Sequence, residues 1–245
     1  MKKILMLIDE SYEHDFCSVC VVCIQGEENI DLVREKVKKM KIDPQLITTS
    51  SGDGRHYAED GIGARQVVAS KISTMPISAY ICLSETVKLE NKQELDEYTY
   101  SFMLPKIIKS LMQKYHGSHD EEYDISLEFE NLSDKRGNDL VFFEKQISHL
   151  RDEFQFSCSV VGKNGEPLIF LPDYFLGFTR DLIIKKRNAE KLLSGSKRKP
   201  ETWPAQYFNL LANKIGIILL MDEDKIKRFG RGRGVADFLS VHRND

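Results

Sequence analysis

The sequence has no apolar run approaching the roughly 18–20 residues that a membrane-spanning helix needs. Its start, Met1-Lys2-Lys3 followed by the apolar residues 4–8, has the outline of a signal peptide. That apolar stretch is too short, however, and Asp9 and Glu10 follow at once. We therefore expect a cytoplasmic protein with no membrane partner.

Cysteine is scarce and odd in number, with five residues in 245. Cys17-x-x-Cys20 has the spacing of zinc ligands, but no second Cys-x-x-Cys or His-x-x-x-His pair follows to complete a tetrahedral site. Residues 16–24 therefore predict a β-strand in which cysteine serves as a small apolar residue. The odd count and the missing export signal also argue against a disulfide framework.

Several common catalytic motifs are missing as well. The chain has no phosphate-binding Gly-x-x-x-x-Gly-Lys-Ser/Thr loop and no Gly-x-Ser-x-Gly nucleophile elbow. Gly61-x-Gly63 lacks the preceding strand that a dinucleotide-binding fingerprint requires.

What the sequence does contain is ordinary apolar content, 41%, and 30% charged residues. That suffices for one sizeable core, or for a domain with a short appendage. The net charge of −3 does not by itself indicate nucleic-acid binding. Acidic residues dominate the middle of the chain and basic residues its last quarter, for example Lys197-Arg198-Lys199. A metal-dependent nuclease needs a basic flank beside an acidic cleft, and a merely solvated surface shows the same pattern.

Apolar periodicity predicts strands that alternate with helices, which indicates an α/β domain that begins with an antiparallel hairpin. Strands are expected at residues 3–8, 16–24, 45–48, 78–83, 124–130 and 155–161, with turns at 10–15 and 163–166. Helices are expected at residues 29–41, 63–73, 92–115 (kinked or split by Pro105), 139–154 and 172–193.

A polar linker at residues 194–200 separates a predicted domain, 1–193, from a basic C-terminal extension, 194–245, packed on or beside it. The extension holds a buried helix or strand near residues 215–221 and a Gly/Arg turn at 229–234. That turn could grip a phosphate backbone or simply be a flexible segment.

Four acids stand out by their placement. Asp9 ends the most apolar strand, Glu128 and Glu130 share one face of a later strand, and Asp173 begins an apolar helix. A carboxylate so close to apolar residues is costly to desolvate unless it is paired or binds a cation. Three of these acids also have a structural explanation: Asp9 as a turn former, Glu130 as a solvated strand end, and Asp173 as a favourable charge at a helix N-terminus.

Leu7-Ile8-Asp9-Glu10-Ser11 resembles the Tyr-Ile-Asp-Glu-Ser-Gly signature of a bacterial family, domain-of-unknown-function family 3800, which is regarded as ribonuclease H-like. Residues 170–177 are similar to its late signature, Leu-Gln-Leu-Ala-Asp-Phe-Leu-Ala-Gly. Residues 130–135 match the polar stretch that begins at its middle acid, with Glu in place of Asp. Residues 56–60 followed by Arg65 resemble a family stretch before the second helix.

The resemblance covers about residues 3–190 and rests on the order and spacing of short motifs. The sequence departs from the family pattern at two positions. Tyr12 replaces the usual Gly after Asp-Glu-Ser, which is expected to alter the turn at that point. Pro172 replaces the usual Ala before Asp173, which bears on the helix start and on the reach of that carboxylate.

The resemblance implies a ribonuclease H-like mixed central sheet flanked by helices, and a site for two Mg²⁺ or Mn²⁺ ions. Asp9 would be the bridging ligand, with Glu130 and Asp173 as the other ligands. Glu10 and Glu128 would be reserve ligands. His56 would assist proton transfer or product release, although a loop histidine is more often a surface residue. Hard cations of this kind prefer carboxylate oxygens, and a pair of them suits phosphodiester hydrolysis.

The predicted function is thus a metal-dependent nuclease acting on RNA or DNA, in a defence (antiphage) or mobile-element setting that the resemblance alone implies. One alternative is a catalytically silent ribonuclease H-like module that binds nucleic acid or a partner protein, and a homo-oligomer is compatible with either. Another is a nucleotide or phosphate-ester hydrolase, which would use the same acids in a narrow pocket.

Overall fold

The structure is a computed structural model that describes residues 2–13, 16–47, 57–58, 60–84, 91–116, 122–132, 139–162, 166–192, 203–222 and 225–242. At residues 13, 47, 116, 185–192, 203–204, 222 and 241–242 it describes the backbone alone.

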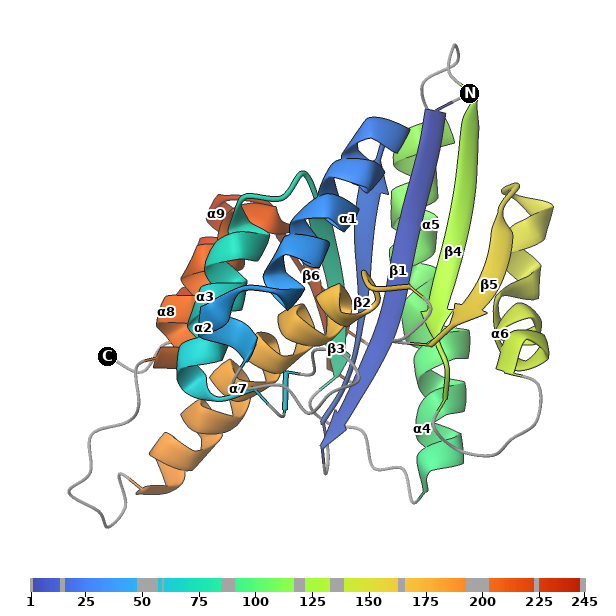
Figure 1. Ribbon diagram of the computed structural model, residues 1–245. Helices are drawn as coiled ribbons and strands as arrows, with labels where there is room; N and C mark the ends of the chain where they lie inside the picture. Colours follow the sequence, from blue (N-terminus) through green and yellow to red (C-terminus); the bar gives the residue numbers. More distant parts are fainter. Residues whose placement is uncertain are drawn as a thin grey trace.

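One mixed sheet of seven strands forms the centre of the molecule, in the order β5-β4-β1-β2-β3-β6-β7 (Figure 1). Its strands are β1 (Lys2–Glu13), β2 (Phe16–Gln25), β3 (Ser78–Ser84), β4 (Tyr123–Glu130), β5 (Ser157–Val161), β6 (Ile215–Asp222) and β7 (Lys225–Gly230). The neighbours β1–β2, β2–β3 and β6–β7 are antiparallel, whereas β1–β4, β4–β5 and β3–β6 are parallel. The predicted α/β class with a mixed sheet is confirmed.

Helices cover both faces of this sheet. They are α1 (Glu27–Lys41), α2 (Pro44–Ile47), α3 (Ile62–Ser73), α4 (Lys92–Tyr98), α5 (Leu104–His116), α6 (Asp139–Ile147), α7 (Phe170–Leu192), α8 (Trp203–Leu211) and α9 (Arg233–His242). Short 3₁₀ segments occupy Ser148–Asp152 and Ala212–Lys214, and a π-helical turn occupies Thr99–Met103.

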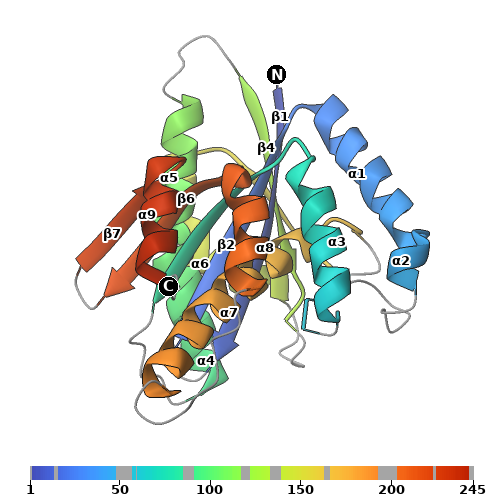
Figure 2. The same ribbon diagram turned by 90° about the vertical axis from the view of Figure 1, so that its left-hand side faces the viewer.

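Strand alternation divides the core into two apolar layers. Leu5, Leu7 and Cys20 face the layer under α1, α3, α7, α8 and α9. Ile4 and Met6 face the layer under the π-helical turn, α5 and α6. Figure 2 shows α1, α2 and α3 on one side of the sheet and α5 and α6 on the other.

The hairpin of β1 and β2 is confirmed, and the four cysteines of β2 and β3 are buried in the core as the strand prediction required. The apolar stripe predicted for the first helix is also confirmed, since Ile30, Val33, Val37 and Met40 are the buried residues of α1. The helix predicted at residues 92–115 is helical throughout, with a π-helical turn between α4 and α5. Pro105 lies two residues after this turn ends at Met103, so its missing N–H falls where the regular α-helical hydrogen-bond pattern is already interrupted.

Two predictions are wrong. The expected turn at residues 10–15 begins too early, because β1 runs on to Glu13 and Tyr12 still pairs with Cys17. Polar residues continue the strand there because their side chains find partners, as described below. Residues 45–47 of the expected strand at 45–48 belong to the short helix α2, whose Gln45 N donates a hydrogen bond to Oδ1 of the preceding Asp43 at 2.9 Å.

Three boundaries also differ from prediction. The helix expected at residues 139–154 ends as α6 at Ile147 and continues as a 3₁₀ turn. The turn expected at residues 229–234 comprises the end of β7, a two-residue turn and the start of α9. The predicted turn at residues 163–166 lies mostly outside the described residues, and the linker at 194–200 lies wholly outside them.

The C-terminal residues belong to the same sheet as the N-terminal ones. β6 pairs in parallel with β3, with Ile81 opposite Ile218, and β7 adds an antiparallel edge strand. Phe208 of α8 and Phe238 of α9 are buried in the core layer that also holds Leu7. The segments on either side of the linker therefore share one hydrophobic core.

Candidate active site

The adjacent parallel strands β1 and β4 carry two of the predicted acids at neighbouring positions. The register of β1 and β4 pairs Leu7 with Glu128 and ends with Ile8 opposite Phe129, and the next residues along the two strands are Asp9 and Glu130. Equivalent residues of neighbouring strands point to the same face and lie roughly 4.8 Å apart along the sheet. Asp9 is buried, with 8% of its surface exposed, and its Oδ1 accepts a hydrogen bond from Glu10 N at 2.9 Å. The side chains of Asp9 and Glu130 therefore extend from the same face of two neighbouring strands.

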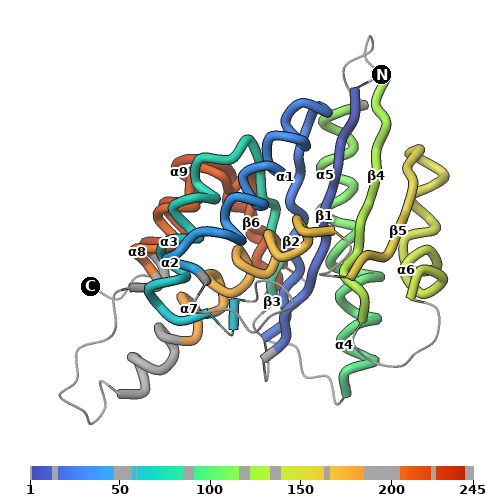
Figure 3. Tube along the Cα trace, viewed as in Figure 1, coloured from blue at the N-terminus to red at the C-terminus, as the bar shows by residue number. Residues whose placement is uncertain are grey.

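Asp9 does not end its strand, as the sequence suggested, but lies within it. It extends from the same face as Leu5 and Leu7, which belong to the core layer covered by α7. The trace of α7 crosses β1 and β2 on that face (Figure 3).

Asp173 lies in the first turn of α7, on the same face of the sheet as Asp9. The backbone N–H of Tyr57 donates a hydrogen bond to Asp173 Oδ2 at 2.8 Å, which fixes the carboxylate. Among the residues that the structure describes, however, no group of three or more His, Cys, Asp or Glu side chains is close enough to hold a metal ion. The structure therefore places Asp9, Glu130 and Asp173 on one face of the sheet, without a complete metal cage among the described residues.

Tyr57 is itself held by a network that sequence reasoning did not find. Its hydroxyl donates to Asp181 Oδ2 at 2.7 Å, and Arg65 bonds both Asp181 and the carbonyl of Tyr57. The guanidinium of Arg65 also stacks over the Tyr57 ring, 4.0 Å from its centroid. His56, the predicted proton-transfer residue, lies outside the described residues.

Glu128 lies on the same face as Glu130 but has different neighbours. Arg34 of α1 donates to Glu166 Oε2 at 2.7 Å, and this ion pair lies next to Glu128. Burial raises the pKa of Glu128, the charge of Glu166 raises it further, and the charges of Arg34 and Lys3 oppose the rise. The structure thus places this predicted reserve ligand beside the Arg34–Glu166 pair.

Glu10 extends from the opposite face of β1, where the hydroxyl of Tyr100 donates a hydrogen bond to its carboxylate. Burial raises the pKa of Glu10 to about 7; the hydrogen bond from Tyr100 opposes that rise, and the charges of Asp96 and Glu130 add to it. A carboxyl with such a pKa is half protonated at neutral pH, as a general acid or base needs to be.

Asp96 is a second buried acid on that face, fully inaccessible to solvent, and its Oδ1 accepts a hydrogen bond from Tyr12 at 2.8 Å. It is not among the acids predicted from the sequence. The available signal was its spacing, because Asp96 lies three, four and seven residues before Thr99, Tyr100 and Met103, which form the buried stripe. The residue that departs from the family signature, Tyr12, is therefore a hydrogen-bond donor to a buried carboxylate.

The basic residues of the C-terminal part lie far from these acids. Lys225, Lys227 and Arg228 are exposed on the edge strand β7. β7 is four strands away from β1, which corresponds to roughly 19 Å. The runs at residues 185–187 and 197–199 have no described side chains.

No family model matches the chain, and no curated protein matches it. Within the described part of the chain, no helix has both the length and the apolar character needed to cross a membrane.

Proposed function

We propose that this protein is a metal-dependent nuclease with a ribonuclease H-like domain. One observation carries the proposal: Asp9 and Glu130 directly follow the last paired residues, Ile8 and Phe129, on the adjacent parallel strands β1 and β4. The resemblance of both segments to one family's signatures implied this pairing, although their positions are more than a hundred residues apart.

The donor set suits hard divalent cations, since it consists of carboxylate oxygens in a partly desolvated place. Mg²⁺ or Mn²⁺ bound there would supply Lewis-acid activation of a water and stabilisation of the leaving oxygen. Asp9 and Glu130 would hold the ions, and Asp173, oriented by the N–H of Tyr57, would complete the set from α7. Glu10 would hold or release a proton near neutral pH.

The test is incubation of the purified protein with labelled single- and double-stranded RNA and DNA, with Mn²⁺, Mg²⁺ or a chelator. We expect metal-dependent cleavage that Asp9→Asn and Glu130→Gln each reduce by at least about 100-fold, because each loses a ligand worth several kcal/mol. Circular dichroism confirms that the variants fold. Equal cleavage by the wild type and Asp9→Asn would remove the proposed role of this site.

A second candidate is a catalytically silent module that binds nucleic acid or a partner protein. The observation that favours it is the incomplete metal cage among the described residues, together with the engagement of Asp173 by Tyr57. This candidate predicts nucleic-acid binding in chelator and no cleavage under any metal condition. The same assay thus separates the two.

A further inference from the structure

A cavity of about 750 Å³ opens at the end of the sheet opposite to the acidic residues. It lies between the start of β1, the end of β2, the start of β3, the first turn of α1 and the end of α5. Lys2, which lines it, is seven residues before Asp9 on β1, which corresponds to roughly 23 Å along the strand. The cavity is therefore separate from the proposed nuclease site.

Hydroxyl and thiol groups gather at the buried side of this cavity. Tyr80, Tyr115 and Cys23 line it, each with 6% or less of its surface exposed, and Cys23 Sγ lies 3.3 Å from Tyr115 Oη. Gly216 makes room for the Tyr80 ring, because a Cβ at that position would overlap the ring's Cε1. Burial raises the pKa values of all three groups, to about 11 for Cys23, so that each keeps its proton at neutral pH, and one proton of Cys23 and Tyr115 is used in the contact between them.

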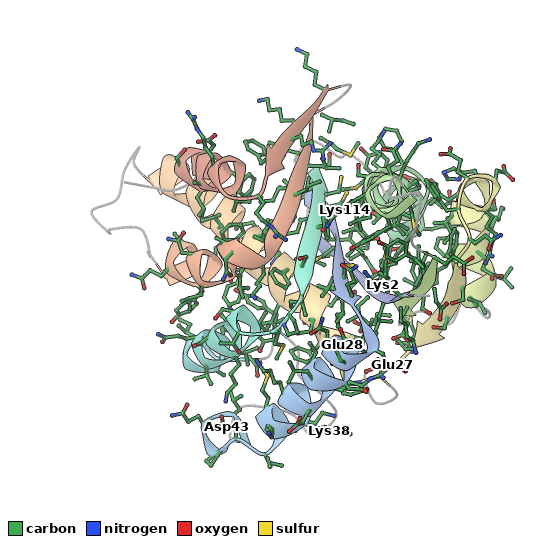
Figure 4. All side chains as sticks on the ribbon, turned by 90° about the horizontal axis from the view of Figure 1, so that it is seen from above. Lys2, Glu27, Glu28, Lys38, Asp43 and Lys114 are labelled. Atoms are coloured by element: carbon green, nitrogen blue, oxygen red, sulfur yellow. The ribbon has the colours of Figure 1, made fainter. Side chains whose placement is uncertain are left out.

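Cations surround the opening. Lys2, Lys3 and Lys114 line it, and Arg231 approaches from the turn after β7, where its guanidinium donates to Ser78 Oγ at 2.9 Å. The ammonium of Lys114 lies 5.4 Å from the centroid of the Tyr115 ring. Figure 4 looks down on this end of the sheet, with Lys2 and Lys114 labelled.

The two acids at the opening are already engaged with the local structure. Glu27 lies 3.9 Å from Lys3, and the carboxylate of Glu28 lies against Gly26, at the start of α1. An acid in the first turn of a helix is stabilised by the helix dipole. These two carboxylates therefore stabilise the N-terminus of α1. The cations around the cavity still outnumber them.

More positive charge lies just beyond the cavity wall, where the segment from Thr74 to Ser78 leads into β3. Lys36 donates to the carbonyl of Thr74 at 2.8 Å, and Lys214 donates to the carbonyl of Met75 at 2.6 Å. Burial lowers the pKa of Lys214, and the charges of Lys36 and Arg231 lower it further. A bound anion would relieve this mutual repulsion of cations.

We propose that this cavity binds a phosphate monoester about the size of a mononucleotide. A phosphate carries up to two charges and three strong acceptor oxygens, which match the ammonium and guanidinium donors around the opening. The volume lies within the usual range for small-molecule sites, and the two tyrosine rings offer an apolar wall for a base or sugar. This site does not depend on the proposed nuclease activity.

Isothermal titration calorimetry in chelator tests the proposal, because a metal-bridged complex at the acidic site cannot form there. The probes are the four ribonucleoside 5′-monophosphates, the unphosphorylated nucleosides and inorganic phosphate. We expect at least one mononucleotide to bind with a Kd on the order of 100 µM or tighter. Lys114→Gln should weaken this binding about tenfold or more, because it removes a charge-assisted contact. Arg231→Gln should act in the same direction.

Lys38→Gln is the matched control, since Lys38 is an exposed lysine toward the far end of α1 (Figure 4), and it should leave the affinity unchanged. Asp9→Asn should also leave it unchanged, which keeps this result distinct from the nuclease test. Three outcomes would each overturn the proposal. They are no binding of any mononucleotide at millimolar concentration, a loss of affinity in Lys38→Gln as large as that in Lys114→Gln, and an affinity for nucleosides or inorganic phosphate equal to that for mononucleotides. Thermal unfolding of each variant shows that the fold is retained.

Discussion

The ring of Tyr57 occupies the space into which a side chain at position 177 would extend. A Cβ added to Gly177 of α7 would overlap Cδ1 and Cγ of this ring. The ring cannot easily give way, because Arg65 stacks on it, Phe178 packs against it edge-on at 4.8 Å, and its hydroxyl is bonded to Asp181. The glycine therefore allows α7 to approach the segment that fixes Asp173.

Gly177→Ala should destabilise the protein by about 1–3 kcal/mol through overpacking, despite the better helix propensity of alanine. Gly63→Ala in α3 is the matched control, because nothing lies within 4 Å of the position that its Cβ would take. It should be neutral or stabilising by up to about 1 kcal/mol. Urea unfolding of both variants provides the measurement. A stability of Gly177→Ala equal to that of the wild type would mean that Tyr57 is not fixed as described.

The raised pKa of Glu10 makes stability depend on pH. Folding raises this pKa from 4.5 to about 7, so the folded protein binds the proton more tightly than the unfolded chain does. The contribution is fully present below about pH 4.5 and is lost as the pH rises through about 7, up to about 3 kcal/mol in all. Urea unfolding between about pH 4.5 and about pH 8 should show this decrease.

Glu10→Gln is the control for that titration, because an amide oxygen still accepts the hydrogen bond from Tyr100 but carries no titrating proton. The variant should lack this part of the pH dependence and should be more stable than the wild type near pH 8. If the two proteins follow the same curve of unfolding free energy against pH, the carboxyl of Glu10 titrates normally.

Glu128 and Glu130 offer a sharp comparison, since they lie two residues apart on one face of β4. If Asp9 and Glu130 hold metal as proposed, Glu130→Gln should weaken Mn²⁺ binding at least about tenfold. Glu128→Gln should leave Mn²⁺ binding unchanged, because Glu128 lies beside the Arg34–Glu166 pair instead. Calorimetric titration with Mn²⁺ decides the question, and equal losses in both variants would contradict this division of roles.

Local patterns in the sequence were enough for most of the fold. Alternating or continuous apolar residues located the strands, and the stripe from Ile30 to Met40 located α1 correctly. These local patterns failed where the local sequence favoured one structure and contacts with distant residues favoured another. The polar residues after Asp9 suggested a turn, whereas Tyr12 and Glu10 remain in β1 because Asp96 and Tyr100 provide distant hydrogen-bond partners.

The candidate site was also predictable only in part, because local patterns locate single residues but do not determine which distant residues become neighbours. Strand periodicity places Glu128 and Glu130 on one face, and the family signatures selected Asp9 and Asp173. No local rule fixes the register of β1 against β4, and that register alone decides whether Glu128 or Glu130 lies beside Asp9. The bonds of Tyr57 to Asp173 and Asp181 join positions more than a hundred residues apart, beyond the reach of periodicity.

The ion pair between Arg34 and Glu166 should stabilise the fold more than the exposed pairs do. Glu166 keeps only 11% of its side chain exposed, and its other oxygen accepts from Leu168 N at 3.2 Å. Arg34→Met would leave this carboxylate buried beside Glu128 without its cation. We expect a loss of about 1–3 kcal/mol in the free energy of unfolding.

Adding Glu166→Gln to Arg34→Met should recover part of this loss, because the amide keeps the bond to Leu168 but carries no charge near Glu128. Lys39→Met is the matched control on the same helix, since its pair with Glu35 is well exposed, and it should change stability little. Urea unfolding of the single and double variants gives the coupling energy directly. Equal losses of unfolding free energy in Arg34→Met and Lys39→Met would show that the Arg34–Glu166 pair stabilises the fold no more than an exposed ion pair does. The proposed influence of this pair on Glu128 would then lose its main support.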